Sequence, residues 1–243
     1  MAKGIAASIE DLDWFLASLQ ARPSRSNVTN PWVTSVPGVD AVDAPQIRLG
    51  HLRAYLAPRL YSAELLLVAE APGYQGCRFS GIAMTCERTL LNRKKGIPAQ
   101  GVFSGPKQRT SATTVSGKAS VRRYGFCEPT ATVVWQTLLG LGIKADKFVL
   151  WNVFPFHPHE PGQPLSNRTP TAAEVESESQ VLLDFVALFP RCRVVAVGET
   201  AGKRLHRHDL SIPVVRHPAN GGVPDFQAGL TRLVTARPPP IHP

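Results

Sequence analysis

Cysteines are few in this sequence, and long apolar runs are absent. The spacing of its four cysteines contains neither C-x-x-C nor a zinc-binding pattern: Cys77, Cys86, Cys127 and Cys192. No apolar run approaches the ~20 residues that cross a bilayer, and the N-terminus lacks the basic-then-apolar order of a signal peptide. We therefore expect free thiols in a reducing, cytoplasmic compartment, with no metal, no cofactor and no membrane association.

Two nucleotide-binding motifs are also missing. Only Gly73 and Gly76 have a spacing that could serve in a G-x-G-x-x-G dinucleotide fingerprint. The one candidate phosphate loop, around Lys118, lacks a hydroxyl directly after the lysine and has Ala112 where its first glycine belongs. Both nucleotide-binding motifs are therefore excluded.

Acidic residues are absent from the segment 92–123, which we call the basic segment. It contains eight lysines and arginines in a chain of net charge +9, and it is rich in Gly, Ser and Thr. This composition predicts a long loop insertion that is mobile without DNA. It is either a solvated basic surface or a binding surface for a polyanion, most simply nucleic acid, and in the second case Arg93, Lys94 and Lys95 contact phosphates.

Apolar residues make up 43% of the 243-residue chain, enough for the core of one globular domain. Four short apolar runs, bounded by turn residues, are typical of strands buried on both faces of a parallel sheet: 65–68, 148–153, 194–198 and 212–215. Because helical patterns separate them, we predict an α/β fold, a three-layer sandwich with a central four-stranded parallel sheet. We expect a single domain over 1–236 and a disordered, proline-rich tail over 237–243.

Periodicity and capping residues predict the helices. The first is capped by Ser8, and the longest begins with Thr171 and Glu174 as a capping box. The predicted helices are 9–20, 45–56, 79–91, 130–139, 171–189, one from 199, and 225–234, and 27–37 is predicted to be a turn-rich connector.

Polar residues that could act chemically follow three of the predicted strands. The first strand runs into the loop 70–81, which holds Glu70, Pro72 and two glycines; the second ends at Asn152, and the fourth ends at His217. In open parallel sheets, ligands bind beyond the carboxyl ends of the strands. The alternatives are ordinary ones, since an asparagine can satisfy a turn and a lone histidine is usually structural.

Two histidines and a glutamate follow the second strand and raise the possibility of a metal site. They are His157, His159 and Glu160, in a loop that alternates histidine with proline. Such residues are more often on the surface than in a metal centre, so we interpret them as surface residues.

Taken together, these strand ends resemble those of the uracil-DNA glycosylase superfamily. The matching motifs are A-E-A-P-G with Phe79, W-N-V with N-R-x-P-T, and H-P-A-N, in the same order along the chain. The resemblance is nearest to the thermostable iron-sulfur branch, whose first motif is G-E-A-P-G. It extends over about 64–234 and excludes the basic segment.

The resemblance implies a DNA glycosylase of base excision repair, with a pocket for a uracil, or a related deaminated base, flipped out of the DNA stack. Phe79 would stack on the base, Asn152 would read its N3 and O4 edge, and His217 would lie near O2. Glu70 would serve in catalysis. The further residues implied are Ala71, Gly73 and Tyr74 at the base and Asn167, Arg168 and Asn220 at the DNA. No lysine in the motifs suggests a Schiff-base lyase, so we expect monofunctional hydrolysis. We also expect the protein to be a monomer.

The chain departs from the superfamily pattern at three places. No cysteine precedes Cys77, so no iron-sulfur cluster is expected. Ala71 stands where the best-known members carry a water-orienting aspartate, with Glu70 one residue earlier. Gly73 stands where they carry a tyrosine that excludes the thymine methyl group. The alternative function is therefore a non-catalytic nucleic-acid-binding relative of the same fold.

Overall fold

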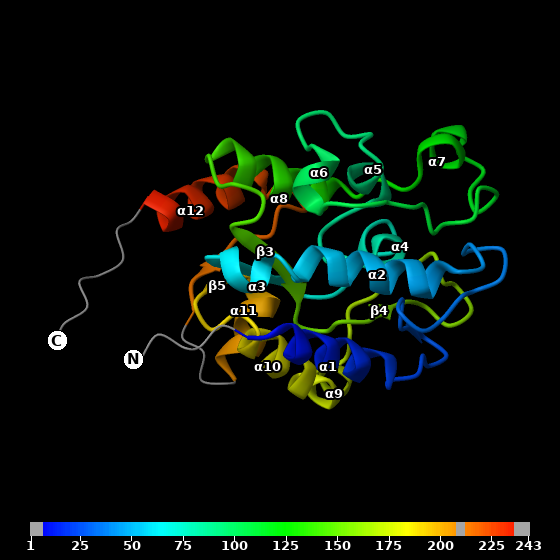
Figure 1. Cartoon of the computed structure of the whole chain (residues 1–243), viewed down its shortest axis with the longest axis horizontal. Helices are drawn as coiled ribbons and strands as arrows, with labels where there is room; N and C mark the ends of the chain where they lie inside the picture. The colour runs from blue at the N-terminus through cyan, green and yellow to red at the C-terminus, as the bar shows by residue number, and fades with distance from the viewer. Residues whose placement is uncertain (1–6, 208–211, 236–243) are drawn as a thin grey trace.

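A parallel sheet of four strands, in the order β3-β2-β5-β6, forms the centre of the protein (Figure 1). The structure is a computed structural model that describes residues 7–207 and 212–235. The strands are β2 (Leu65–Ala69), β3 (Phe148–Asn152), β5 (Arg193–Val197) and β6 (Val214–Val215). Every residue of β2 and β3 is buried, which explains their unbroken apolar sequences. The predicted α/β class and the four-stranded parallel sheet are confirmed.

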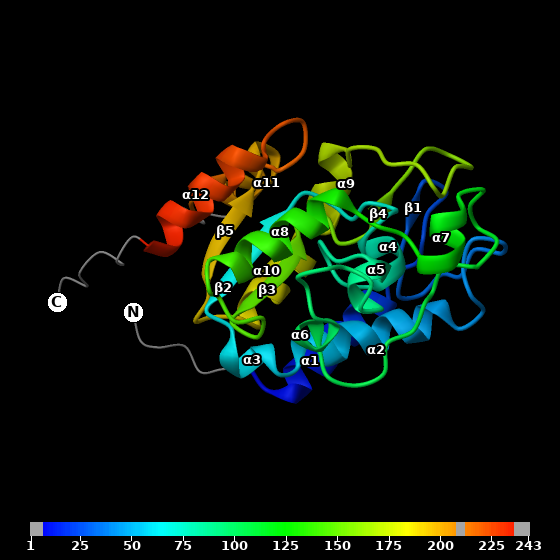
Figure 2. The same ribbon diagram turned by 90° about the horizontal axis from the view of Figure 1, so that it is seen from above.

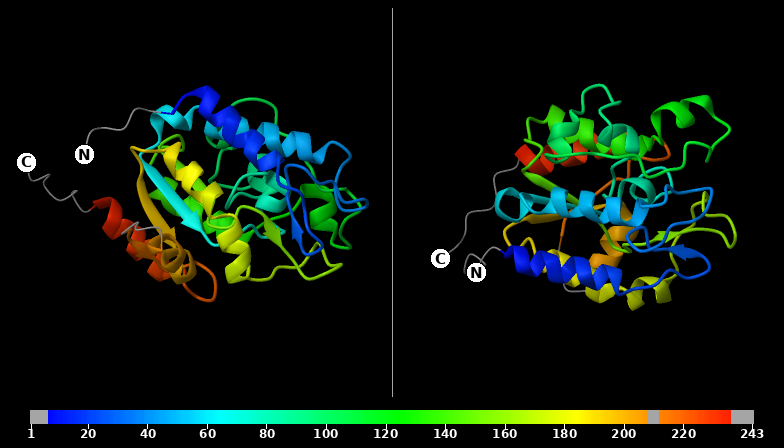
Figure 3. Two further views of the ribbon diagram at one scale, coloured as in Figure 1. Left: turned by 90° about the horizontal axis from the view of Figure 1, so that it is seen from below. Right: turned by 45° about the vertical axis from the view of Figure 1, so that its right-hand side comes forward.

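Helices cover both faces of the sheet (Figures 1 and 3). On one face lie α8 (Pro129–Gly140) and α12 (Val223–Thr235), and on the other lie α1 (Ile9–Gln20), α9 (Ala172–Ser177), α10 (Ser179–Ala187) and α11 (Glu199–His206). The side chains of β3 point alternately into the two helical layers. Trp151 stacks on Phe185 of α10 with ring centroids 4.0 Å apart, whereas Phe148 meets the edge of Trp135 of α8.

The outer edge of β3 is closed by side chains from α2 (Ala44–Leu56) and α3 (Arg59–Ser62). The backbone N–H of Leu150 donates to the Tyr55 hydroxyl at 3.0 Å, and Arg59 Nε donates to the Phe148 carbonyl at 3.0 Å. These bonds satisfy backbone groups that an edge strand would otherwise leave unpaired.

Two of the predicted helices are interrupted. Instead of one helix over 79–91, the chain forms α4 (Cys77–Ser80) and α5 (Glu87–Leu90), because Gly81 and Met84 have positive φ angles of 77° and 46°. The helix predicted over 171–189 divides into α9 and α10 at Glu178. The capping box of Thr171 and Glu174 is present as predicted.

A small antiparallel sheet lies outside the main one. Its strands β1 (Val28–Thr29) and β4 (His157–Pro158) include part of the segment predicted to be only a connector. The prediction that His157 and His159 are surface residues was wrong: both are buried, and His159 Nε2 lies 3.0 Å from Thr29 Oγ1. No cluster of three metal-ligating side chains occurs in 7–207 and 212–235.

The basic segment is folded rather than a free loop. It contains α6 (Ala99–Val102) and α7 (Ala119–Tyr124), and Figure 2 shows α4 and α5 between the sheet and α7. Thr110 and Ser111, in the middle of the segment, are buried. The segment predicted to be a loop thus has helices and buried residues of its own, and its mobility without DNA stays a prediction. The predicted tail at 237–243 lies outside the described residues.

Glu87 of α5 holds the basic segment against the rest of the domain. Its carboxylate accepts hydrogen bonds from the backbone N–H groups of Thr110, Ser111 and Phe126 at 2.9 to 3.0 Å and from the Ser111 hydroxyl at 2.7 Å. Four donors surround this one buried carboxylate and satisfy its hydrogen-bonding capacity.

Asp40 forms a second anchor, at the bridge between residues 40 and 111. Arg78 donates two hydrogen bonds to its carboxylate at 2.8 and 2.7 Å, and Arg48 donates a third. Burial opposes the ionised form of Asp40, but the two guanidinium groups outweigh it and lower the pKa of this carboxyl. Arg48 also donates to Thr110, so both anchors meet at the same buried point of the basic segment.

Replacement of Glu87 tests this anchoring. Glu87→Ala leaves three buried backbone N–H groups without an acceptor, each costing about 1 to 3 kcal/mol. We expect the free energy of unfolding to fall by about 3 to 5 kcal/mol in urea denaturation, a loss typical of a broken buried network. Glu176→Ala, on the exposed surface of α9, is the matched control and should change it by less than about 0.5 kcal/mol. A loss below about 1 kcal/mol for Glu87→Ala would contradict this role.

Candidate active site

A cavity of about 690 Å³ opens beyond the carboxyl ends of the central strands. Most of its lining comes from the segments that follow β2, β3 and β6, as predicted for a parallel sheet. The lining residues from these segments include Glu70, Ala71, Gly73, Asn152, Asn167, Arg168, His217 and Asn220. The structure therefore brings together eight residues that the sequence analysis selected from distant parts of the chain.

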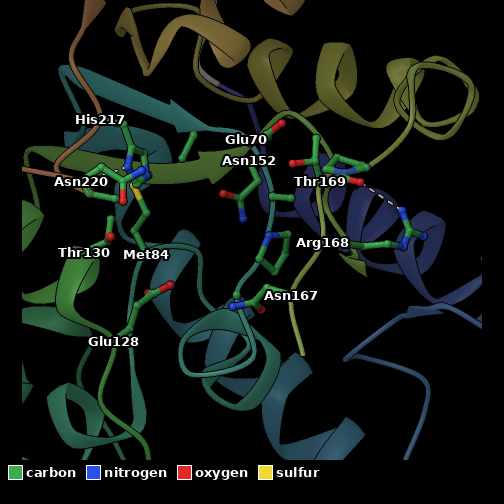
Figure 4. Close-up of a pocket in the computed structure, with 16 residues that line it drawn as sticks. Glu70, Met84, Glu128, Thr130, Asn152, Asn167, Arg168, Thr169, His217 and Asn220 are labelled. Carbon is green, nitrogen blue, oxygen red and sulfur yellow. Dashed lines mark hydrogen bonds between the residues drawn. The ribbon is translucent and has the colours of Figure 1, made fainter. Parts of the chain in front are cut away.

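Asn152 ends β3 and points its amide into the cavity (Figure 4). Its side chain is nearly buried, with the residue 3% exposed. Within the part of the chain that the structure describes, no protein group hydrogen-bonds this amide. Asn152 thus offers a free donor and a free acceptor side by side.

His217 lies across the cavity, in the turn after β6. Its Nδ1 accepts a hydrogen bond from the backbone N–H of Ala219 at 3.1 Å, so the neutral ring carries its proton on Nε2. Burial, and then the charge of Arg216, lowers the pKa of His217. The turn is tight enough to require glycine at 222, where a Cβ would lie 2.1 Å from the His217 carbonyl oxygen. At neutral pH the imidazole is therefore an uncharged donor.

Glu70 follows β2 directly and lines the cavity from its rim (Figure 4). Burial raises the pKa of its carboxyl, while the charge of Arg204 lowers it. A carboxylate at this place can accept a proton or hold a water molecule once it is ionised.

Parts of the predicted DNA-contact set are engaged in holding the loop 167–170. Asn167 Oδ1 accepts from the Tyr74 N–H at 2.9 Å. The Arg168 guanidinium points away from the cavity (Figure 4). It donates to both carboxylate oxygens of Glu174 at 2.8 and 2.6 Å. This pairing raises the pKa of Arg168. The charge of Arg168 is thus already paired, whereas Asn220 stays exposed at the rim.

Comparison with known protein families agrees with this geometry. A family model described as the Uracil DNA glycosylase superfamily matches residues 59–238, about three quarters of the chain. The chain belongs to the uracil DNA glycosylase superfamily.

Among solved structures, the chain is similar to SMUG2 of Pedobacter heparinus. The two share 13% sequence identity with a TM-score of 0.55, over 94% of this chain and 98% of the other. At this identity the likeness concerns the fold, which is the one that the sequence predicted. A search of curated proteins finds no match. No helix within 7–207 and 212–235 is both long and apolar enough to span a membrane.

The position of Phe79 differs from the one that the superfamily resemblance implied. Phe79 is fully buried, does not line the cavity, and stacks on Phe126 with ring centroids 4.6 Å apart. Tyr74 also lies outside the cavity lining and meets the edge of Phe126. The structure therefore does not support base stacking by Phe79, whose ring is in one apolar cluster with Phe126 and with Val121 of the basic segment.

Three lining residues were missed in the sequence: Met84, Glu128 and Thr130. Met84 lies inside the segment that was predicted to be one helix over 79–91. That prediction missed the left-handed turn at Met84, which brings its side chain to the cavity. Glu128 precedes Pro129 at the start of α8, and a proline in the first helical turn is a signal that could have marked this position.

The exposed cations of the basic segment provide a test of DNA contact. Arg93 and Lys95 are exposed, whereas Lys94 Nζ lies 3.3 Å from Cys127 Sγ. If Arg93 and Lys95 each neutralise one phosphate, replacing both by alanine should reduce the slope of log affinity against log salt by about 1.8 on duplex DNA. Lys144→Ala is the control. Lys144 is exposed and precedes the start of β3, at the end of the strand opposite to the cavity, so this change should leave the slope unchanged. An unchanged slope in the double variant would remove these two residues from the DNA contact surface.

Proposed function

We propose that this member of the superfamily is a monofunctional DNA glycosylase that hydrolyses the N-glycosidic bond of uracil, or a related deaminated base, for base excision repair. The observation that carries the proposal is the unpartnered amide of Asn152 in a cavity that also receives His217 as an uncharged donor. Uracil presents an N3–H donor beside the O4 acceptor, and an asparagine amide matches both. The cavity volume of about 690 Å³ is ample for a base with part of its sugar.

The reaction would be driven by stabilising charge that appears only in the transition state. Breaking the bond from C1′ to N1 leaves its electron pair on the base, which becomes an anion, and leaves an oxocarbenium-like sugar. The Nε2–H of His217 would donate to O2 of that anion. Glu70, once ionised, would orient the water that adds to C1′ and accept its proton.

A neutral histidine suits this role in the present site. Burial and Arg216 lower the pKa of His217, so the ring stays uncharged at neutral pH and needs no partner anion in the free protein. Extrusion of the base costs a few kcal/mol of stacking and pairing, least for a mismatched base, which favours uracil opposite guanine.

Release of free uracil from a uracil-containing oligonucleotide is the direct test. Purified protein should release it, and His217→Ala should lower the single-turnover rate by about 10² to 10³, the usual loss for one such donor. Thermal melting of the variant should match the wild type, because within 7–207 and 212–235 the ring hydrogen-bonds only to Ala219. No release by the wild type would favour the non-catalytic relative, for which Ala71 at the usual aspartate position is the supporting observation.

Asn152→Asp tests the reading of the base. The aspartate replaces an amide donor by an acceptor, so it loses the bond to O4 of uracil and gains a partner for the N4 amino group of cytosine. We expect uracil excision to fall by about 10-fold or more, from about 1 to 3 kcal/mol per unmatched buried group, and the ratio of cytosine to uracil excision to rise. The measurement is single-turnover excision from matched oligonucleotides. Unchanged uracil excision would show that Asn152 does not contact the base.

A further inference from the structure

Glu128 is a second carboxyl group in the cavity, and the mechanism above does not use it. It lies at the N-terminal end of α8 and lines the cavity together with Met84 and Thr130. Its Oε2 is buried and has no hydrogen-bond partner among the described residues. Buried polar atoms without partners are rare in folded proteins, and this one belongs to a side chain that lines the cavity, which is consistent with a functional role for the carboxyl group.

The loop after β2 is shaped around this carboxyl. A Cβ at position 76 would lie 2.2 Å from Glu128 Oε2, and a Cβ at position 73 would lie 3.0 Å from Oε1. Glycine at both positions therefore leaves the space that the Glu128 side chain fills. The glycines of A-P-G-Y-Q-G thus admit a group from α8 to the wall of the cavity.

The surroundings of Glu128 favour its protonated form. Burial, and then the charge of Cys127, raises the pKa of Glu128 to about 7. Among the described residues, two titratable groups face it, Cys127 on the same chain segment and Cys77 on α4. A hydrogen bond from Cys86 lowers the pKa of Cys127, which favours its charged form, whereas burial and then Glu128 raise the pKa of Cys77. No lysine or arginine of the described residues forms a salt bridge with Glu128.

We propose that Glu128, in its uncharged form, contacts the extruded base and donates a hydrogen bond to its carbonyl oxygen, which stabilises the base as it leaves as an anion. The inference rests on the glycosylase function proposed above. Figure 4 shows the Glu128 carboxyl and the His217 ring on different sides of Met84. The Asn152 amide lies to one side of all three residues. A base whose O2 faces His217 turns O4 away from it, and a carbonyl oxygen that accepts one hydrogen bond from Asn152 has a second lone pair for Glu128.

This arrangement predicts a loss of activity as the pH rises. An ionised Glu128 would place a negative charge beside the developing anion and would have no proton to donate. Uracil excision should therefore fall as the pH rises through about 7, where Glu128 loses its proton. Glu70 acts in the opposite sense, because it must be ionised to orient water, and it limits the rate at low pH.

Glu128→Gln separates this role from a structural one. The amide has nearly the same shape, is uncharged at every pH and still donates a hydrogen bond. Near pH 6 its single-turnover rate on uracil should lie within about 3-fold of the wild type. From there to about pH 8.5 the wild type should slow by about 10-fold and the variant by less than about 3-fold, so the variant becomes the faster enzyme. The same alkaline loss in both proteins would overturn the inference.

Two matched controls accompany this variant. Glu176→Gln, on the exposed surface of α9, should keep the wild-type pH profile. Cys127→Ser should keep most of the alkaline loss, and a profile flattened by that change would assign the titration to the thiol instead.

Binding without turnover distinguishes failure of this inference from failure of the proposed function. The probe is an oligonucleotide with 2′-fluoro-2′-deoxyuridine, whose glycosidic bond resists cleavage, compared with the same oligonucleotide containing deoxycytidine, which has no O4 carbonyl. For the wild type, the preference for the uracil probe should weaken by about 3-fold or more between pH 6 and pH 8.5, and for Glu128→Gln it should not change. If the wild type shows this pH-dependent preference but releases no uracil, the proposed function fails and only the contact between Glu128 and the base is supported. If the wild type cleaves but both proteins share one binding profile, the inference alone fails.

Discussion

The parallel pairing of β2 with β3 is the constraint on which the site depends. Its register places Ala69 beside Asn152, so the two strands end side by side. The ladder continues past the strand ends, because Val153 donates to the Ala69 carbonyl at 2.8 Å and Phe154 donates to the Glu70 carbonyl at 2.9 Å. Backbone hydrogen bonds therefore hold Glu70 beside the end of β3, where Asn152 lies. A shift of register by one residue would turn Asn152 to the other face and remove it from the cavity.

Two buried carboxylates outside the basic segment hold it against the rest of the domain. Glu87 accepts directly from Thr110 and Ser111 of the segment, whereas Asp40 acts through Arg48, which donates to Thr110. Asp40 is paired with two arginines, whereas Glu87 is held by four hydrogen-bond donors. The buried middle of the segment leaves Arg93 and Lys95 exposed to solvent. A packed segment presents these cations in fixed positions. Binding of a polyanion by this segment would therefore cost less ordering entropy than binding by a mobile loop.

Burial shifts the titratable groups of the cavity toward their uncharged forms. The pKa values of Glu70 and Glu128 are raised and that of His217 is lowered, in each case chiefly by desolvation. At neutral pH His217 is therefore uncharged and Glu128 is partly protonated in the free cavity. Such a site can admit an uncharged base and still offer donors to the anion that departs.

The sequence by itself determined the elements whose signals are local. Unbroken apolar runs predicted the strands because both faces of this sheet are covered, and Thr171 with Glu174 predicted a helix start because a capping box needs only four residues. The order of the motifs at the strand ends likewise predicted the superfamily, and with it the positions of Asn152 and His217. These features depend on neighbours in the chain or on the shared edge of a parallel sheet.

Only the tertiary structure decided which other side chains reach the cavity. Phe79 is buried against Phe126, 47 positions away in the chain, while a left-handed turn at Met84 brings that residue to the cavity instead. Glu128 reaches the site because glycines 73 and 76, far from it in sequence, leave its carboxyl room. These outcomes depend on contacts between distant residues, whose packing and desolvation act only once the chain has folded.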